Sequence, residues 1–191
     1  YDTACELLTM EVNAAIEGFF SAGVEYILVA DGHGPGAIDI LKLDPRVELL
    51  RGWGRGWPLE LDRGFDALAF VGQHAKSRTE NSNMTHTQSC GYLELSINGT
   101  AIGEFGQLVM CASELSIPTI FASGEKALAE EASALVPGIE TAVVKRGTVP
   151  GRGDDLTTEE YREFHKGAIH LHPVKAREII RKGCICLLYT S

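Results

Sequence analysis

The sequence lacks any long hydrophobic run. Of its 191 residues 45% are apolar and 23% are charged, yet no stretch approaches the ~18 consecutive apolar residues that a membrane-spanning helix needs. No basic segment followed by an apolar core indicates a signal peptide. The composition therefore predicts a soluble globular chain with a sizeable core and no membrane partner.

Cysteines are few, and basic residues are outnumbered by acidic ones. The five cysteines are an odd number at irregular spacing, which argues against a disulfide framework and favours a reducing, cytoplasmic location. With 17 Lys and Arg against 26 Asp and Glu, and no basic cluster, a nucleic-acid partner held by phosphate contacts is not expected. The first residue is not Met, so we expect the true start of the protein to lie upstream.

Three common catalytic motifs are missing. The sequence contains no H-E-x-x-H zinc motif, no G-x-S-x-G nucleophile elbow and no Walker A loop. A catalytic site in this chain must therefore be assembled by the fold from residues that are distant in sequence.

Short apolar runs alternate with segments of helical periodicity. Thr3 and Glu6 have the spacing of a capping box at the start of an expected helix, and Asn98-Gly99 predicts a hairpin turn between 91–97 and 100–102. Strands are expected at 24–30, 47–50, 67–71, 118–122 and 140–144, and helices at 4–22, 37–43, 103–116, 126–135, 157–165 and 173–182. This order predicts an α/β fold, a mostly parallel sheet flanked by helices, with an inserted antiparallel β-hairpin.

We expect one domain over residues 1–183 that lacks its first strand. The helix before the first visible strand suggests that another strand precedes it. Lys182-Gly183 has the pattern of a helix end, and residues 184–191 differ from the rest in the manner of a non-native tail. The loop 51–58 carries Trp53 and Trp57, which serve either as lids or subunit contacts or as plugs that hold the loop down.

Histidines and one glutamate follow the expected strands or begin a helix, flanked by glycine. His33, His74, His86 and Glu104 are expected where side chains converge at the carboxyl edge of a parallel sheet. Imidazole and carboxylate are the ligands of catalytic zinc sites. The plainer alternatives are a turn or anion-binding role for His33 in 31–36, a strand-capping role for His74 and a helix-dipole role for Glu104.

The remaining histidines lie in a polar C-terminal region. His165, His170 and His172 are expected to be solvated there. The pair His170-x-His172 has a spacing that could bind a metal ion adventitiously.

Four motifs in the same order resemble the zinc-dependent D-aminopeptidases of the dipeptide-transport operon type (DppA-like). They are Asp31-Gly-His33, Gly72-Gln-His74-Ala75, Met84-Thr-His86 and Gly103-Glu104-Phe-Gly106. The resemblance runs from residue 1 to about Arg146. It implies a binuclear zinc site in which His33, His74 and Glu104 are metal ligands and His86 is the catalytic residue.

The same resemblance implies a short peptide substrate with an N-terminal D-residue, and a ring-like homo-oligomer such as a decamer. Family members begin with a strand that ends in Asp-x-Glu-Gly, whose carboxylates complete the site, and this sequence starts after that point. Three protein ligands do not hold two zinc ions in normal coordination. We therefore expect the 191-residue fragment to be an impaired enzyme. Asp31 is expected either to orient a ligand imidazole or to stabilise its turn.

Two other functions remain open at the level of the sequence. One is a non-catalytic α/β module that binds an anionic ligand at the glycine-rich turn 31–36. The other is a metal-dependent amidase of different specificity, which would share every ligand. Metal content and peptide hydrolysis distinguish the first alternative from a peptidase.

Overall fold

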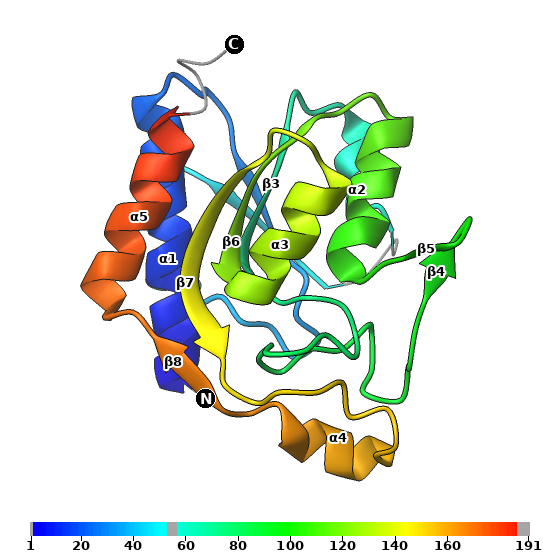
Figure 1. Cartoon of the computed structure of the whole chain (residues 1–191). Helices are drawn as coiled ribbons and strands as arrows, with labels where there is room; N and C mark the ends of the chain where they lie inside the picture. Colours follow the sequence, from blue (N-terminus) through cyan, green and yellow to red (C-terminus); the bar gives the residue numbers. More distant parts are fainter. Residues whose placement is uncertain (1, 53–56, 187–191) are drawn as a thin grey trace. The chain divides into compact units, whose positions relative to one another are not determined.

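The computed structural model describes residues 2–52 and 57–186, which form two compact units. The first unit comprises the described residues up to 65 and from 172 onward, and the second comprises residues 66–171. Both contain helices and parallel strands, so the predicted α/β class is confirmed (Figure 1). None of the described helices is long and apolar enough to cross a membrane.

The first unit pairs two helices and two short strands. Its elements are α1 (Asp2–Ser21), β1 (Leu28–Asp31), β2 (Glu48–Arg51), the single turn η1 (Leu61–Arg63) and α5 (Pro173–Cys186). Strands β1 and β2 are parallel, with Leu28 opposite Glu48 and Asp31 opposite Arg51. Helices α1 and α5 lie side by side (Figure 1).

The close contact between these helices explains why α5 is longer than expected. A Cβ atom at Gly18 would lie 2.7 Å from the Cβ of Cys184, and the Cys184 side chain is fully buried. Burial of Cys184 stabilises an additional helical turn, so Lys182-Gly183 does not end the helix. That residues 184–191 are a non-native tail stays a prediction, and residues 187–191 lie outside the described residues together with Trp53.

Two further local predictions were wrong in this unit. Helix α1 begins at Asp2, so Thr3 lies inside it and does not cap it. Residues 37–39 are irregular and residues 40–43 form a turn and bend, not a helix. The amides of Ala37, Ile38 and Asp39 donate to the side chains of Asp31 and Thr9, and the amides of Lys42 and Leu43 donate to the Asp39 carbonyl oxygen, so the segment closes a single turn and does not continue as a helix.

The second unit is built on a four-stranded sheet in the order β3-β6-β7-β8. Its elements in chain order are β3 (Leu68–Gln73), β4 (Ser96–Ile97), β5 (Thr100–Ala101), α2 (Glu104–Glu114), β6 (Thr119–Glu125), α3 (Lys126–Leu135), β7 (Glu140–Gly147), α4 (Thr158–Phe164) and β8 (Ala168–His170). Strands β3, β6 and β7 are parallel, and β8, which the sequence pattern did not predict, is antiparallel to β7. The parallel strands therefore end at one edge.

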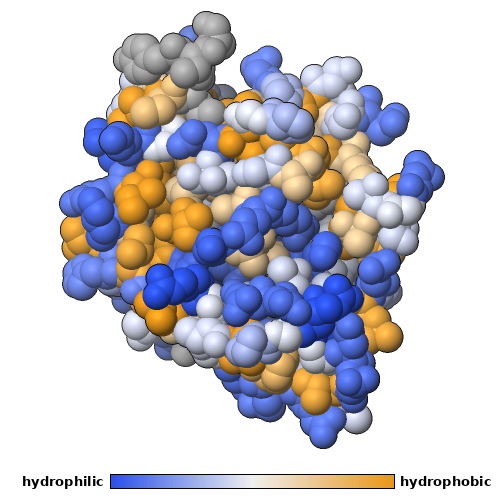
Figure 2. All heavy atoms as spheres, in the orientation of Figure 1, coloured by the Kyte–Doolittle hydropathy of each residue, from blue (hydrophilic) through white to orange (hydrophobic). Residues whose placement is uncertain are grey.

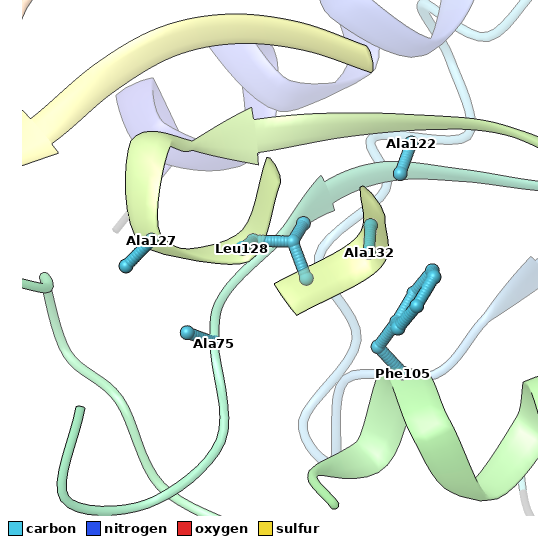
Figure 3. Packing of buried hydrophobic residues seen from close by; sticks show 6 residues of the cluster. All are labelled: Ala75, Phe105, Ala122, Ala127, Leu128 and Ala132. Atoms are coloured by element: carbon cyan, nitrogen blue, oxygen red, sulfur yellow. The ribbon is translucent and has the colours of Figure 1, made fainter. Parts of the chain in front are cut away.

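The core of this unit explains why β3, α2 and α3 are held together. Figure 3 shows Phe105 of α2 facing Leu128 and Ala132 of α3, beneath β6. Phe70 of β3 packs against Phe105, with ring centroids 4.7 Å apart. Since Phe105 follows Glu104 directly, burial of its ring positions the start of α2.

The predicted hairpin is confirmed, although its strands are short. Asn98 and Gly99 have φ angles of 52° and 82°, as a type I′ turn requires, and β4 and β5 pair antiparallel on either side. Residues 91–95 are not strand. On the face shown in Figure 2, apolar and hydrophilic residues are interspersed.

Candidate metal centre

His74 follows β3 at the carboxyl edge of the sheet. Gly72 has a φ angle of 75°, which turns the chain as the strand ends. Nδ1 of His74 hydrogen-bonds the carbonyl oxygen of Ala75 at 2.9 Å. With Nδ1 as the donor, Nε2 is the nitrogen that faces the cluster and that would bind a metal ion once deprotonated.

His86 lies in the irregular segment between β3 and the hairpin. Its Nδ1 hydrogen-bonds the carbonyl oxygen of Met84 at 2.9 Å, and its Nε2 faces the Glu104 carboxylate. The segment is held by buried polar contacts, because the amide of Ser77 donates to Thr87 Oγ1 at 3.1 Å and the amide of Met84 donates to the carbonyl oxygen of His165 at 2.8 Å. The position of His86 therefore depends on long-range hydrogen bonds and not on a regular element.

Glu104 is the first residue of α2. Its Oε1 accepts a hydrogen bond from the Gln88 amide at 2.7 Å. Gly103 packs directly on Lys76, since a Cβ atom added at Gly103 would lie 2.8 Å from the Lys76 Cα. This close approach brings the start of α2 next to the segment that follows His74.

These three side chains meet in one cluster. Nε2 of His74 lies 3.2 Å from Oε2 of Glu104, and Nε2 of His86 lies 3.8 Å from Oε1 of the same carboxylate. The two imidazole rings are 4.2 Å apart between centroids. One ligand atom from each residue lies within 4.8 Å of the others, and all three side chains are partly buried. Two imidazole nitrogens and a carboxylate are a donor set that fits zinc.

The electrostatics of the cluster favour a cation between His74 and Glu104. Burial by itself lowers the pKa of His74, but the hydrogen bond to Glu104, the charge of Glu104 and the hydrogen bond to the Ala75 carbonyl oxygen together outweigh this effect, and the pKa is raised. Burial raises the pKa of Glu104, yet the contacts with His74, His86 and the Gln88 amide together lower it. Because Glu104 is ionised and faces two imidazoles, a divalent cation could replace the proton on His74.

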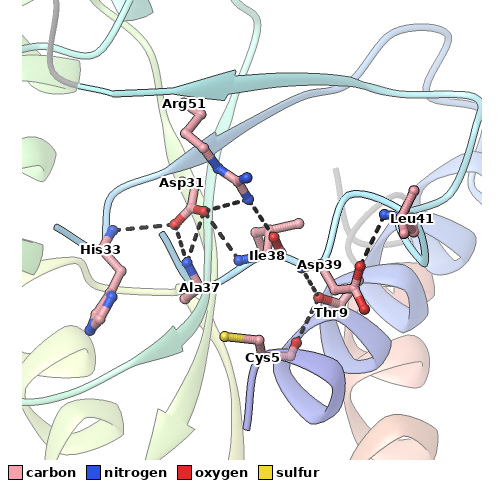
Figure 4. Close-up of polar contacts among 9 residues, drawn as sticks. All are labelled: Cys5, Thr9, Asp31, His33, Ala37, Ile38, Asp39, Leu41 and Arg51. Carbon is pink, nitrogen blue, oxygen red and sulfur yellow. Dashed lines mark hydrogen bonds and ion pairs between the residues drawn. The ribbon is translucent and has the colours of Figure 1, made fainter. Parts of the chain in front are cut away.

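Asp31 and His33 belong to the first unit. The Asp31 carboxylate accepts hydrogen bonds from the amides of Ala37 at 2.9 Å and Ile38 at 3.1 Å, and it contacts the Arg51 guanidinium at 3.3 Å (Figure 4). It reaches the backbone amide of His33 at 3.4 Å. These contacts are those of a turn-stabilising residue, and orientation of an imidazole by Asp31 stays a prediction. The same holds for His33 as a metal ligand.

The same contacts weigh against an anion site in the turn 31–36. Amides at the end of a glycine-rich turn could hold a phosphate, but here the amides of Ala37 and Ile38 donate to a carboxylate of the protein itself. The Gly36 amide donates to the His33 carbonyl oxygen at 2.8 Å. A negative ligand would have to displace Asp31 or lie beside its charge.

His165 was expected to be solvated, and this prediction was wrong. Its side chain is 1% exposed and packs edge-on against Tyr161 and Phe164, with centroid distances of 4.9 and 4.5 Å. Nδ1 is buried without a hydrogen-bond partner among the described residues. The surrounding glutamates indicated exposure, but the end of α4 turns inward at this residue.

Burial of His165 predicts a pH-dependent stability. Burial lowers the pKa of His165 below its ordinary value, so below about pH 6.5 the unfolded chain binds the proton more readily than the folded chain. The His165 contribution to the free energy of unfolding should therefore fall as the pH decreases from about 6.5 toward the folded pKa, by at most about 1.4 kcal/mol per pH unit. Urea unfolding of wild type and His165→Gln between pH 7.5 and 5.5 measures this effect. Parallel pH curves for the two proteins would contradict it.

Two carboxylates near the cluster, the fully buried Glu125 and the partly buried Glu131, were not identified from the sequence. Glu125 ends β6 and Glu131 lies in α3, and both accept hydrogen bonds from the backbone that follows His74. Burial raises the pKa of each. The signal for Glu125 was present, because it follows an apolar strand and a glycine in the same manner as His74.

Comparisons with known proteins identify relatives of this chain. A family model described as D-aminopeptidase (Peptidase_M55) matches residues 1–184. The D-aminopeptidase of Bacillus subtilis (strain 168) is 30% identical over 149 residues, which are 76% of this chain and 54% of that protein. The solved structure of Zn-dependent D-aminopeptidase DppA from Bacillus subtilis, described as a self-compartmentalizing protease, matches 99% of this chain and 64% of its own with a TM-score of 0.85 and 26% identity. The chain thus spans about half the length of the curated relative.

Proposed function

Since the chain belongs to the D-aminopeptidase family, we propose that the protein is a zinc metallopeptidase that removes N-terminal D-residues from short peptides. One observation carries the proposal. Ligand atoms of His74, His86 and Glu104 lie within 4.8 Å of one another, on segments that are held by separate contacts. The relatives named above, a D-aminopeptidase and a Zn-dependent D-aminopeptidase, support the choice of substrate and metal.

We assign metal binding to His74 and Glu104, with His33 as a further ligand. His74 presents Nε2 and Glu104 presents its carboxylate, and the motif around His33 resembles that of a family ligand. Zinc in such a site supplies Lewis-acid activation of water and polarisation of the scissile carbonyl. Two zinc ions per subunit need more ligands than these three, and we propose that an Asp-x-Glu-Gly segment of the full-length protein supplies them.

We assign proton transfer to His86. Its Nδ1 donates to the Met84 carbonyl oxygen and its Nε2 faces the cluster at 3.8 Å from Glu104. An imidazole held in this way can accept a proton from the attacking water and return it to the leaving amine. The 32% exposed His86 side chain is more accessible than the 19% exposed side chain of His74, as a group that meets the substrate requires.

We propose that the protein works as a ring-like homo-oligomer, such as a decamer, in the cytoplasm. The description of the solved relative as a self-compartmentalizing protease supports an assembly that encloses its active sites. The five free cysteines agree with a reducing compartment. A metal-dependent amidase with another substrate shares the same ligands, and a substrate panel separates it from a peptidase.

Metal analysis and hydrolysis of D-Ala-D-Ala test the proposed function. We expect about two zinc ions per subunit in the full-length protein and loss of most of this zinc in His74→Ala and Glu104→Ala. His170→Ala, which removes an exposed histidine on β8, is the control and should keep both zinc and activity. A metal-free wild-type protein, or zinc that depends on His170 and not on Glu104, would refute the proposal.

A further inference from the structure

Glu125 is a completely buried carboxylate that bonds to two separate segments of the metal centre. It lies at the end of β6 with 0% of its surface exposed. Its Oε1 accepts a hydrogen bond from the Ala75 amide at 2.9 Å, and its Oε2 accepts one from the Asn83 amide. Both oxygens therefore receive backbone donors.

The two amides stand next to the two histidines of the cluster. Ala75 follows His74 directly and its carbonyl oxygen receives Nδ1 of His74. Asn83 precedes Met84, whose carbonyl oxygen receives Nδ1 of His86. One side chain thus connects the short backbone segments that orient both imidazoles.

The Asn83 segment is also held from its other side. The Asn83 side-chain amide donates to the carbonyl oxygens of His165 at 3.1 Å and Lys166 at 3.2 Å. With Glu125 on one side and these carbonyl groups on the other, Asn83 has little freedom to move. The distance between the two histidines then depends on where Glu125 places Asn83 relative to Ala75.

A second, partly buried carboxylate extends this arrangement to Glu104. Oε2 of Glu131 accepts a hydrogen bond from the Lys76 amide at 2.8 Å. Lys76 is the residue against which Gly103 packs, and Gly103 precedes Glu104. Glu131 therefore supports the contact that brings the third ligand to His74.

Burial of carboxylates is unfavourable unless their oxygens accept hydrogen bonds, and replacing them by apolar residues often leaves stability unchanged or raises it. The role of Glu125 and Glu131 is therefore to hold the backbone beside the metal ligands in place, and not to raise the free energy of unfolding. We propose that Glu125 is a positioning residue of the metal centre, which sets the separation of His74 and His86 through the Ala75 and Asn83 amides, with Glu131 in the same role for Glu104. This inference rests on the proposed zinc site.

Zinc affinity of Glu125→Gln tests the inference. Glutamine keeps the size of the side chain but replaces one acceptor oxygen by an NH₂ donor, so one of the two amides loses its partner. We expect zinc affinity, measured by competition with a chelator, to fall roughly 10–100-fold, as for other residues that orient metal ligands. The visible absorption of the Co²⁺-substituted protein should change as well, because the ligand geometry changes.

Val144→Ala on the neighbouring strand β7 is the matched control. It removes buried apolar volume from the same sheet without touching the amides near the histidines, so it should lower stability while zinc affinity and the Co²⁺ spectrum stay at wild-type values. Glu125→Asp keeps both acceptors on a shorter side chain and should recover part of the lost affinity. It also serves as the test variant if Glu125→Gln does not fold.

The outcomes separate the two proposals. If the wild-type protein binds no zinc, the proposed function fails and the inference fails with it. If wild type binds zinc and Glu125→Gln binds it equally well with an unchanged Co²⁺ spectrum, only the positioning role of Glu125 is refuted. An equal loss of affinity in Val144→Ala at matched stability would also refute it, because the effect would then follow from stability alone.

Discussion

Replacing His86 by alanine is expected to lower the turnover of D-Ala-D-Ala by about 10²–10⁴-fold while the zinc content stays at the wild-type value. The variant removes the imidazole of His86 but leaves the proposed ligands His74 and Glu104, whose Nε2 and Oε2 atoms are 3.2 Å apart. Steady-state kinetics combined with metal analysis of the same preparation measures both quantities.

The structure makes this experiment decisive between two roles for His86. Its Nε2 belongs to the same set of ligand atoms as those of His74 and Glu104, so geometry alone allows it to bind the metal. If His86→Ala loses zinc together with activity, His86 is a ligand and another group must transfer the proton. The control is His170→Ala, which should change neither quantity.

Replacing Gly124 by alanine should destabilise the second unit by about 3 kcal/mol or more. A Cβ atom at Gly124 would lie 2.0 Å from the carbonyl oxygen of Gln73. That contact is with backbone, so it cannot be relieved by a rotamer change, and β3 and β6 would have to move apart. Thermal or urea unfolding measures the loss of stability.

The same substitution should also weaken zinc binding, because Gln73 precedes His74 and Gly124 precedes Glu125. Gly91→Ala is a suitable control, since its added Cβ meets only ordinary contacts at 3.5 Å or more. It should change the free energy of unfolding by less than about 1 kcal/mol. A Gly124→Ala protein with wild-type stability would show that the two strands can separate at little cost.

The regular elements of the second unit could be predicted from the sequence because their signals are local. Short apolar runs predicted β3, β6 and β7. The pair Asn98-Gly99 predicted the hairpin, because both residues tolerate the positive φ angles of its turn. Helix α3 was predicted with the bounds that the structure has, 126–135. Each of these predictions uses only the pattern of a few consecutive residues.

The failures have a common cause, which is that contacts outside a segment decide its structure. Residues 37–43 have helical character, but the amides of Ile38 and Asp39 bond to the Asp31 carboxylate and the Thr9 hydroxyl, and the chain closes one turn at the Asp39 carbonyl oxygen. Helix α5 continues past Gly183 because Cys184 is buried against Gly18. Strand β8 is three residues long and depends on pairing with β7. No pattern within these segments carries that information.

By itself the sequence determined the α/β class and the set of histidines and carboxylates that could bind a metal, because strand ends and helix starts are encoded locally. Only the tertiary structure showed that ligand atoms of His74, His86 and Glu104 lie close together. It also showed that the Asp31 carboxylate accepts hydrogen bonds from its own turn, and that Glu125 accepts hydrogen bonds from the backbone next to both histidines. The physical reason is that these relations depend on hydrogen bonds and close packing between residues that no local pattern connects, from six residues apart for Asp31 and Ala37 to 50 for Ala75 and Glu125. His74 and His86 are near in the chain, but the backbone beside each of them bonds to one carboxylate from β6.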